Sequence, residues 1–144
     1  RENLVVKLRW GRQSVETIIS ACGNDCAVCP RHLPKTDEEL QATAELWHKI
    51  GYRDRVVSAA EIACGGCRAA NECRYGIAKC AAEKGVANCG LCDRYPCEQT
   101  VACLRTTAGF EPACLAHCTH SEYLTLREAF FRKREHLDEI ARNR

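Results

Sequence analysis

Apolar residues recur at helical spacing between residues 36 and 50. The repeating positions are Leu40, Ala44, Trp47 and Ile50. Residues three and four positions apart share one face of a helix, so this face is expected to be buried. Thr36 and Glu39 form the pattern of a capping box at its start, and Gly51 offers the left-handed conformation that commonly ends a helix. The stretch therefore predicts one helix.

A second apolar stripe runs through the last part of the chain. Its members are Tyr123, Leu126, Phe130, Leu137 and Ile140. Thr119 and Glu122 give a second capping box at its start. Side chains of both charges occupy the positions between, which is typical of an amphipathic helix with a solvated face. We expect one final helix that packs on the domain or on a partner, and not on a membrane.

The middle of the chain predicts shorter elements. Residues 52–62 are weakly helical, and residues 74–84 predict a helix that Gly85 would end. Pro96 is expected to begin another helix, with Glu98 in its first turn. A proline there loses no hydrogen bond, and an acidic side chain interacts favourably with the helix dipole.

These elements indicate a mostly α, small and loop-rich fold of a single domain. An N-terminal segment, 1–21, would carry a short strand over 3–10 and a short helix over 13–20. A cysteine-rich core would occupy 22–100, and a helical extension over 101–144 would pack on it. A chain of 144 residues has the usual length of one domain.

Few large apolar side chains are available to build a core. Leucine, isoleucine, valine and phenylalanine together number 28 of 144 residues, just under the roughly 20% that marks a weak core. The chain also contains 13 cysteines. A small fold with a weak core needs covalent or metal cross-links, and the cysteines can provide them.

The cysteines favour metal ligation over disulfide bonds. Thirteen is an odd number, so they cannot all pair within one chain. The first residues show no apolar export signal, and no stretch reaches the roughly 18 apolar residues that a membrane helix needs. We therefore expect a cytoplasmic protein, and disulfides are rare in that reducing compartment. A disulfide scaffold or a set of free thiols is the alternative.

The spacing of the cysteines is the strongest chemical signal in the chain. In two pairs, Cys64–Cys67 and Cys89–Cys92, two residues separate the cysteines, and this spacing directs both sulfurs to one metal ion. An earlier cluster has the spacing C-x3-C-x2-C and consists of Cys22, Cys26 and Cys29. Radical S-adenosylmethionine enzymes share that spacing, but they need repeated βα units, which this chain does not show.

Together, the motifs CGNDCAVCP, CGGCR and KCAAEKGVANCGLCDRYPCE resemble a small cysteine-rich prokaryotic family known as domain of unknown function 3795. The resemblance covers roughly residues 22–100. It implies a small protein that binds zinc through its cysteines, and it brings no catalytic activity with it. Carried over to this sequence, the predicted metal residues are Cys22, Cys26, Cys29, Cys64, Cys67, Cys73, Cys80, Cys89, Cys92 and Cys97.

Three further cysteines lie outside this pattern: Cys103, Cys114 and Cys118. With His117 and His120 nearby, they offer the ligands of a third metal site. The alternative is that they are small buried thiols in a helical core.

Zinc is the first choice of metal, because it favours closed tetrathiolate sites that stabilise small folds. A [4Fe–4S] cluster is the alternative, because it also needs four cysteines. One grouping joins Cys64, Cys67, Cys89 and Cys92 in a single site. The earlier cluster would then take its fourth ligand from Cys73, Cys80 or Cys97, a choice that spacing alone does not fix.

Two classes of function are consistent with these features. The first is a zinc-stabilised module that binds another protein. The second is an iron–sulfur protein for electron transfer or redox partnering. We expect no catalytic residue, since the chain has no nucleophile elbow, P-loop or HExxH motif. A net charge of +2 and few aromatic residues disfavour a nucleic-acid partner, and a membrane partner is not expected.

Overall fold

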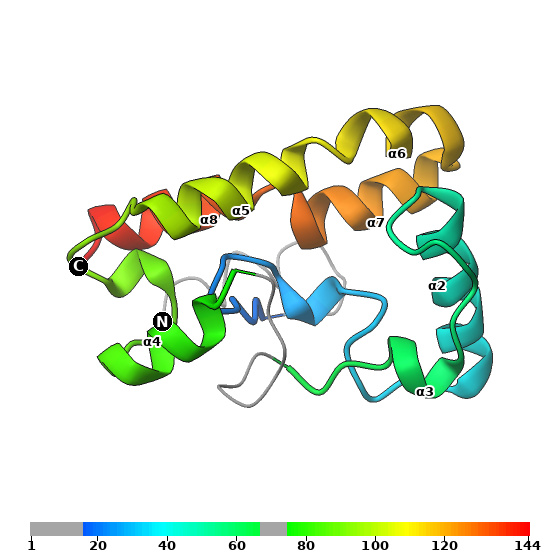
Figure 1. The fold of residues 1–144 in the computed structure, drawn as a ribbon, viewed down its shortest axis with the longest axis horizontal. Helices are drawn as coiled ribbons and strands as arrows, with labels where there is room; N and C mark the ends of the chain where they lie inside the picture. Colours follow the sequence, from blue (N-terminus) through cyan, green and yellow to red (C-terminus); the bar gives the residue numbers. More distant parts are fainter. Residues whose placement is uncertain (1–15, 67–74) are drawn as a thin grey trace, which may run out of the picture.

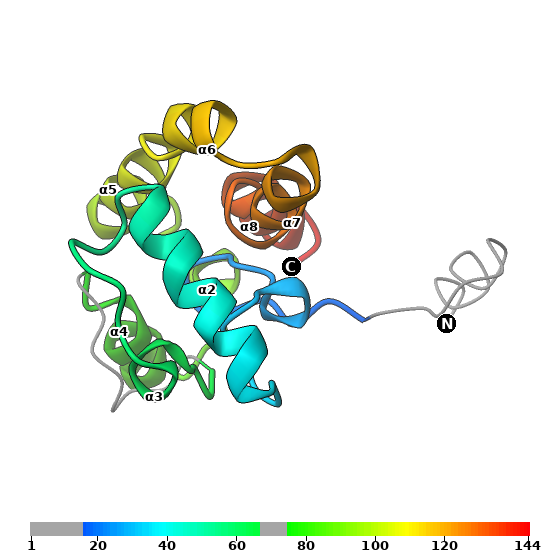
Figure 2. The same cartoon turned by 90° about the vertical axis from the view of Figure 1, so that its right-hand side faces the viewer.

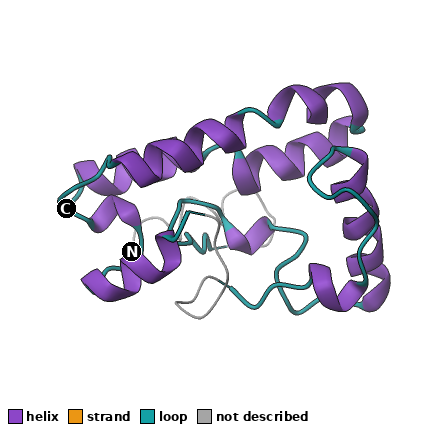
Figure 3. Cartoon of the chain, viewed as in Figure 1, coloured by secondary structure: helices purple, strands orange, loops and turns teal. Residues whose placement is uncertain are grey.

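The structure is a computed structural model that describes residues 16–66 and 75–144. Its elements in chain order are the 3-10 helix η1 (Cys26–Val28), α2 (Asp37–Lys49), α3 (Ala59–Ile62), α4 (Ile77–Lys84), the 3-10 helix η2 (Cys89–Leu91), α5 (Glu98–Ala108), α6 (Glu111–His117), α7 (His120–Phe130) and α8 (Lys133–Arg142). In the described residues, helices and loops make up the fold (Figure 3), together with two isolated β-bridges. The predicted mostly α fold is confirmed.

The four C-terminal helices run in two lines. Figure 1 shows α5 and α6 following one another along the upper edge, with α8 and α7 as a second line. Helix α2 crosses the end of the two lines at which α6 and α7 lie, and it is in the foreground of Figure 2. The segment that carries η1 passes through the middle. None of the helices in the two described ranges is both long and apolar enough to cross a membrane.

The larger core packs α2 and α3 against α6 and α7. Its buried side chains are Leu40, Ala44, Trp47, Ile50, Val57, Ile62, Cys114 and Leu126. The ring of Trp47 meets that of Phe130 edge-to-face, with 5.7 Å between ring centres. Both capping-box hydrogen bonds between Thr36 and Glu39 are present, and Gly51 has a φ of +86°. The predictions for this helix are confirmed.

Several predicted elements are shorter than expected or absent. Residues 16–20 are extended rather than helical, because Ile19 pairs with Asp25 across a tight turn. The predicted strand over 3–10, and the first part of that helix, lie outside the described residues. Within 52–62, only Ala59–Ile62 forms a helix, which begins where Ser58 supplies a capping box.

Pro96 does not begin α5. It follows Tyr95 through a cis peptide bond, and the helix begins two residues later at Glu98, with Cys97 as its N-cap. Glu98 is in the first turn, as predicted. Helix α4 ends at Gly85, which has a φ of +71°, so the predicted end of that helix is confirmed.

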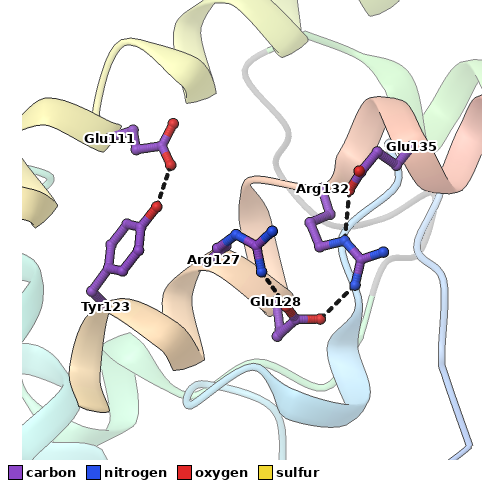
Figure 4. Close-up of polar contacts among 6 residues, drawn as sticks. All are labelled: Glu111, Tyr123, Arg127, Glu128, Arg132 and Glu135. Atoms are coloured by element: carbon purple, nitrogen blue, oxygen red, sulfur yellow. Dashed lines mark hydrogen bonds and ion pairs between the residues drawn. The ribbon is translucent and has the colours of Figure 1, made fainter. Parts of the chain in front are cut away.

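The predicted final helix is divided into α7 and α8. Arg132 lies at the break, and its guanidinium donates to Glu128 Oε1 at 2.7 Å and to Glu135 Oε1 at 2.6 Å (Figure 4). The break allows Phe130 and Phe131 to pack on the larger core, while Leu137 is fully buried on a different surface. One straight helix would not direct its apolar stripe to both places.

Helix α8 packs directly on two glycines of the cysteine-bearing loops. A Cβ on Gly90 would lie 2.9 Å from Ile140 Cβ and 2.9 Å from the Leu137 carbonyl oxygen. A Cβ on Gly23 would lie 2.9 Å from the Lys133 carbonyl oxygen. The backbone of both loops therefore touches the helix, at positions where a side chain does not fit.

Helices α6 and α7 are joined by a hydrogen bond near their ends. Tyr123 Oη donates to Glu111 Oε2 at 2.6 Å (Figure 4). This bond raises the pKa of Tyr123 above its ordinary value, and burial adds to the effect. The protonated tyrosine is thus the form that the folded state favours.

Replacing Gly90 by alanine should destabilise the fold by about 1–3 kcal/mol, because the added methyl group overlaps α8. Gly109→Ala is the matched control, since Gly109 has a φ of −65° and a Cβ there has its closest contact at 3.3 Å. We expect that control to change the free energy of unfolding by less than about 0.5 kcal/mol. Urea unfolding measures the free energy of unfolding of both variants. Equal effects would show that α8 does not fix the η2 loop.

Tyr123→Phe should change the pH dependence of stability. A raised folded-state pKa means that the bond contributes fully below the unfolded pKa of about 10, and that its contribution is lost as the pH rises through the folded value. The variant should lose about 0.5–1 kcal/mol at neutral pH. Between about pH 9 and pH 11 it should then lose less stability than the unmodified protein. Parallel curves in urea unfolding would contradict this assignment.

Candidate metal centres

Four of the predicted metal residues line one cavity of about 330 Å³: Cys80, Cys89, Cys92 and Cys97. They come from three segments of the chain. Cys80 lies in the middle of α4, Cys89 and Cys92 bracket the turn of η2, and Cys97 is the N-cap of α5. We call these four residues the second cluster. The fold therefore gathers four thiols that are up to 17 positions apart in the sequence.

The two C-x2-C turns of the described residues have the same backbone form. The Cys29 N–H donates to the Cys26 carbonyl at 3.2 Å, and the Cys92 N–H donates to the Cys89 carbonyl at 3.0 Å. In the second turn, the Arg94 N–H also donates to Cys92 Sγ at 3.4 Å. Backbone N–H groups directed at sulfur stabilise a thiolate, which is the form that binds metal.

Thr100 holds two sulfurs of the second cluster. Its hydroxyl donates to Cys89 Sγ at 3.3 Å and lies 3.3 Å from Cys97 Sγ. The Thr100 side chain is 1% exposed, so it is fixed by packing. The hydroxyl thus sets the separation of a sulfur on η2 from a sulfur on α5.

The thiols of the second cluster differ in how readily they ionise. Burial raises the pKa of Cys89, and nearby Cys97, Cys22 and Cys80 add to this. Burial also opposes ionisation of Cys97, but hydrogen bonds from Thr100 and from backbone N–H groups at the start of α5 outweigh it and lower the pKa. Lys84 and Arg94 line the same cavity and place positive charge beside the sulfurs.

A second group of predicted residues gathers around η1. Cys29 is 7% exposed, and Cys64 lies close enough to raise the pKa of its thiol, in addition to the effect of burial. The Cys64 N–H donates to the Arg31 carbonyl at 2.9 Å, and the Cys64 carbonyl accepts from the Leu33 N–H at 3.0 Å. Cys64, the first residue of the CGGC segment, therefore lies directly against the loop that follows Cys29.

The η1 turn itself is fixed by Asp25 and α7. One Asp25 carboxylate oxygen accepts from the N–H groups of Ile18 and Ala27 at 3.1 and 3.0 Å. The Asp25 N–H donates to the Ala129 carbonyl of α7 at 2.9 Å. We call Cys26, Cys29 and Cys64, with Cys67 as the expected partner of Cys64, the first cluster. Cys67 and Cys73 lie outside the described residues.

This arrangement differs from the predicted grouping of Cys64 with Cys89 and Cys92. Cys64 is bonded to the loop of the first cluster, and Cys89 and Cys92 share a cavity with Cys80 and Cys97. Within 16–66 and 75–144, no three His, Cys, Asp or Glu side chains already converge in a geometry that holds a metal ion. The sulfurs of the second cluster share a cavity without meeting at one point.

Cys22 lies near Cys89 of the second cluster, but its own side-chain hydrogen bonds are made with residues outside both clusters. Its thiol accepts a hydrogen bond from Cys103, which is the largest cause of a pKa well below the ordinary value, and nearby Lys133 lowers the pKa further. Lys133 is 6% exposed. Burial by itself would lower the pKa of this lysine, but the two thiols outweigh burial and raise it. Sequence analysis missed Lys133, which looks like one of many charged residues in an amphipathic helix.

The remaining cysteines belong to the larger core. Cys114 is fully buried there, and Cys118 packs against it. Burial raises the pKa of Cys114 to about 12, so this thiol stays protonated. Within the described residues, these thiols do not form a group with His117 and His120 that could hold a metal ion. The interpretation of Cys103 and Cys114 as buried thiols is confirmed.

Comparison with known proteins identifies a family but no characterised relative. The profile of a family described as a protein of unknown function (DUF3795) matches residues 18–102, which is more than half of the chain. The resemblance inferred from the cysteine motifs is thus confirmed. No curated protein matches the chain, and no solved structure matches it.

Proposed function

Since the chain belongs to the DUF3795 family, we propose that it is a metal-stabilised interaction protein whose two cysteine clusters each hold a zinc ion. The observation that carries this proposal is the cavity lined by Cys80, Cys89, Cys92 and Cys97. Four thiols around one space form the donor set of a structural zinc site. Such sites supply folding free energy to chains with weak cores.

The first cluster supports a second site of the same composition. It pairs the η1 turn, Cys26 and Cys29, with Cys64 and Cys67 of the CGGC segment. The backbone hydrogen bonds of Cys64 with Arg31 and Leu33 place the start of that segment beside the η1 loop. Each site would then consist of one C-x2-C turn and two cysteines from elsewhere in the chain. Cys22 and Cys73 are not needed for either.

The environment of the second cluster suits thiolates. Thr100, the Arg94 N–H and the N–H groups at the start of α5 donate to its sulfurs. Lys84 and Arg94 offset the double negative charge that four thiolates and one zinc ion would carry. Such partners around the sulfurs orient and tune metal ligands.

An iron–sulfur cluster is the second candidate, because the cavity has room for one. A volume of about 330 Å³ can accommodate a [4Fe–4S] cluster, which uses the same four thiolates. The function would then be electron transfer or redox partnering in the cytoplasm.

The interaction role is supported by exposed apolar side chains on the C-terminal helices. Leu115 of α6 is 62% exposed and Leu124 of α7 is 43% exposed. They lie 18 and 27 residues after Cys97, the last cysteine of the second cluster. Another protein is the partner that such side chains suit.

Elemental analysis beside an absorption spectrum, on protein purified without oxygen, tests the metal. We expect two zinc ions per chain and a colourless solution. Iron, acid-labile sulfide and a band near about 400 nm would replace zinc by the iron–sulfur candidate. Protein that contains neither metal and binds none when it is added to the reduced chain would overturn both.

Single cysteine variants test the partition into two sites. Cys97→Ser should lose the second-cluster zinc and retain the other, and Cys64→Ser should do the reverse. Each variant should melt at a lower temperature, because metal binding contributes to folding. Cys118→Ser is the matched control, since Cys118 is a half-buried cysteine of the larger core, and it should retain both ions. Loss of both ions from either site variant, in protein that is still helical by circular dichroism, would contradict two independent sites.

A further inference from the structure

A buried lysine faces thiols near the junction of α5 and α8. Lys133 Nζ donates to Cys103 Sγ at 3.4 Å and to Thr107 Oγ1 at 2.8 Å. No carboxylate of the described residues lies within 4.0 Å of this ammonium group. A buried positive charge is costly unless a negative partner offsets it. The acidic groups near this lysine are the thiols of Cys22 and Cys103 and the hydroxyl of Tyr52.

The second thiol at this place is that of Cys22. Cys22 packs against the buried cluster that contains Cys103, the two thiols lie within hydrogen-bonding reach of each other, and Ser20 Oγ lies 3.6 Å from Cys22 Sγ. Cys22 is half-buried, whereas Cys103 is 2% exposed. Cys22 is therefore the residue of the pair that has some surface exposed to solvent.

The packing of three segments keeps these sulfurs together. Gly23, next to Cys22, touches the first turn of α8, and its carbonyl lies 2.8 Å from His136 Nδ1 of the same helix. Cys103 lies in the middle of α5, one turn before Thr107. Because Lys133 bonds to both residues of α5, the loop, α5 and α8 are fixed against one another at this point.

We propose that Cys22 and Cys103 form a redox-active dithiol, which a small two-electron oxidant of the peroxide class converts to a disulfide. Neither thiol belongs to the two proposed metal sites, so this inference goes beyond the proposed function. The thiolate form is the nucleophile in such reactions, and a neighbouring lysine favours that form. Cys22, the partly exposed residue of the pair, is the residue that the peroxide attacks, and the buried Cys103 is the resolving thiol.

The reaction balances in two steps. The Cys22 thiolate attacks one peroxide oxygen, the O–O bond breaks, and the hydroxide that leaves takes a proton to become water. Cys22 is then a sulfenic acid. The Cys103 sulfur attacks the Cys22 sulfur, the S–O bond breaks, and the proton of the Cys103 thiol leaves with that oxygen as a second water molecule. Two electrons pass from the two sulfurs to the peroxide.

The test is oxidation of the reduced, metal-containing full chain with one equivalent of hydrogen peroxide. Free thiols are then alkylated, and the digested protein is analysed by mass spectrometry. The expected product is a peptide pair linked through Cys22 and Cys103. The hydrogen-bonded pair Cys114 and Cys118, which lies beside Glu122, is the internal control and should stay alkylated.

Two variants separate the roles of the resolving thiol and the lysine. In Cys103→Ala, Cys22 should be trapped as a sulfenic acid and labelled by dimedone. In Lys133→Met, the rate of linkage should fall about tenfold or more, since the cation that favours the thiolate is gone. Lys79→Met, an exposed lysine of α4, is the matched control and should react at the unmodified rate.

Several outcomes would overturn the proposal. One is a product in which Cys22 is linked to Cys89, or in which the second cluster is oxidised while Cys22 is still free. Another is equal rates for Lys133→Met and Lys79→Met, both confirmed as folded by circular dichroism. Because zinc content is measured on the same samples, failure of the dithiol is distinguished from failure of the metal sites.

Discussion

The contact of α8 with two glycines is the constraint on which the rest of the structure depends. Gly23 precedes the η1 turn and Gly90 lies within the η2 turn, and neither leaves room for a Cβ beneath the helix. A single rigid element thus fixes the loops of both cysteine clusters relative to each other. The same helix brings Lys133 to Cys103. The C-terminal helices are therefore part of the framework of the cysteine sites and not an appendage to them.

The sequence predicted helix ends correctly where residues within one turn of the end determine it. The capping boxes at Thr36 and Thr119 and the glycine after α4 identified true helix ends, because each depends on residues within one turn. The break between α7 and α8 was not predictable in this way. The apolar stripe continues across it at helical spacing, and only the two separate surfaces that Phe130 and Leu137 cover require the chain to turn.

The candidate sites show the same division between local and distant information. Spacing predicted that the C-x2-C pairs form turns, and the turn of each described pair, Cys26–Cys29 and Cys89–Cys92, is a 3-10 helix. The partners of each turn depend on where α4 and α5 pass in space, which spacing does not contain. Lys133 illustrates the limit most clearly: its importance comes from Cys103 and Thr107 on another helix, and nothing near it in the sequence indicates this.

The hydrogen bonds between the CGGC segment and the loop after Cys29 have a consequence for how the chain can vary. The Leu33 N–H donates to the Cys64 carbonyl, and the Cys64 N–H donates to the Arg31 carbonyl. The segment between Leu33 and Cys64, which contains α2 and α3, therefore has its two ends side by side. Because α2 and α3 carry buried side chains of the larger core, changes in length are cheap only at the exposed loop positions of this segment, where they leave its base unchanged. The number of residues between Cys29 and Cys64 can vary at those loops, while the short intervals inside each turn cannot.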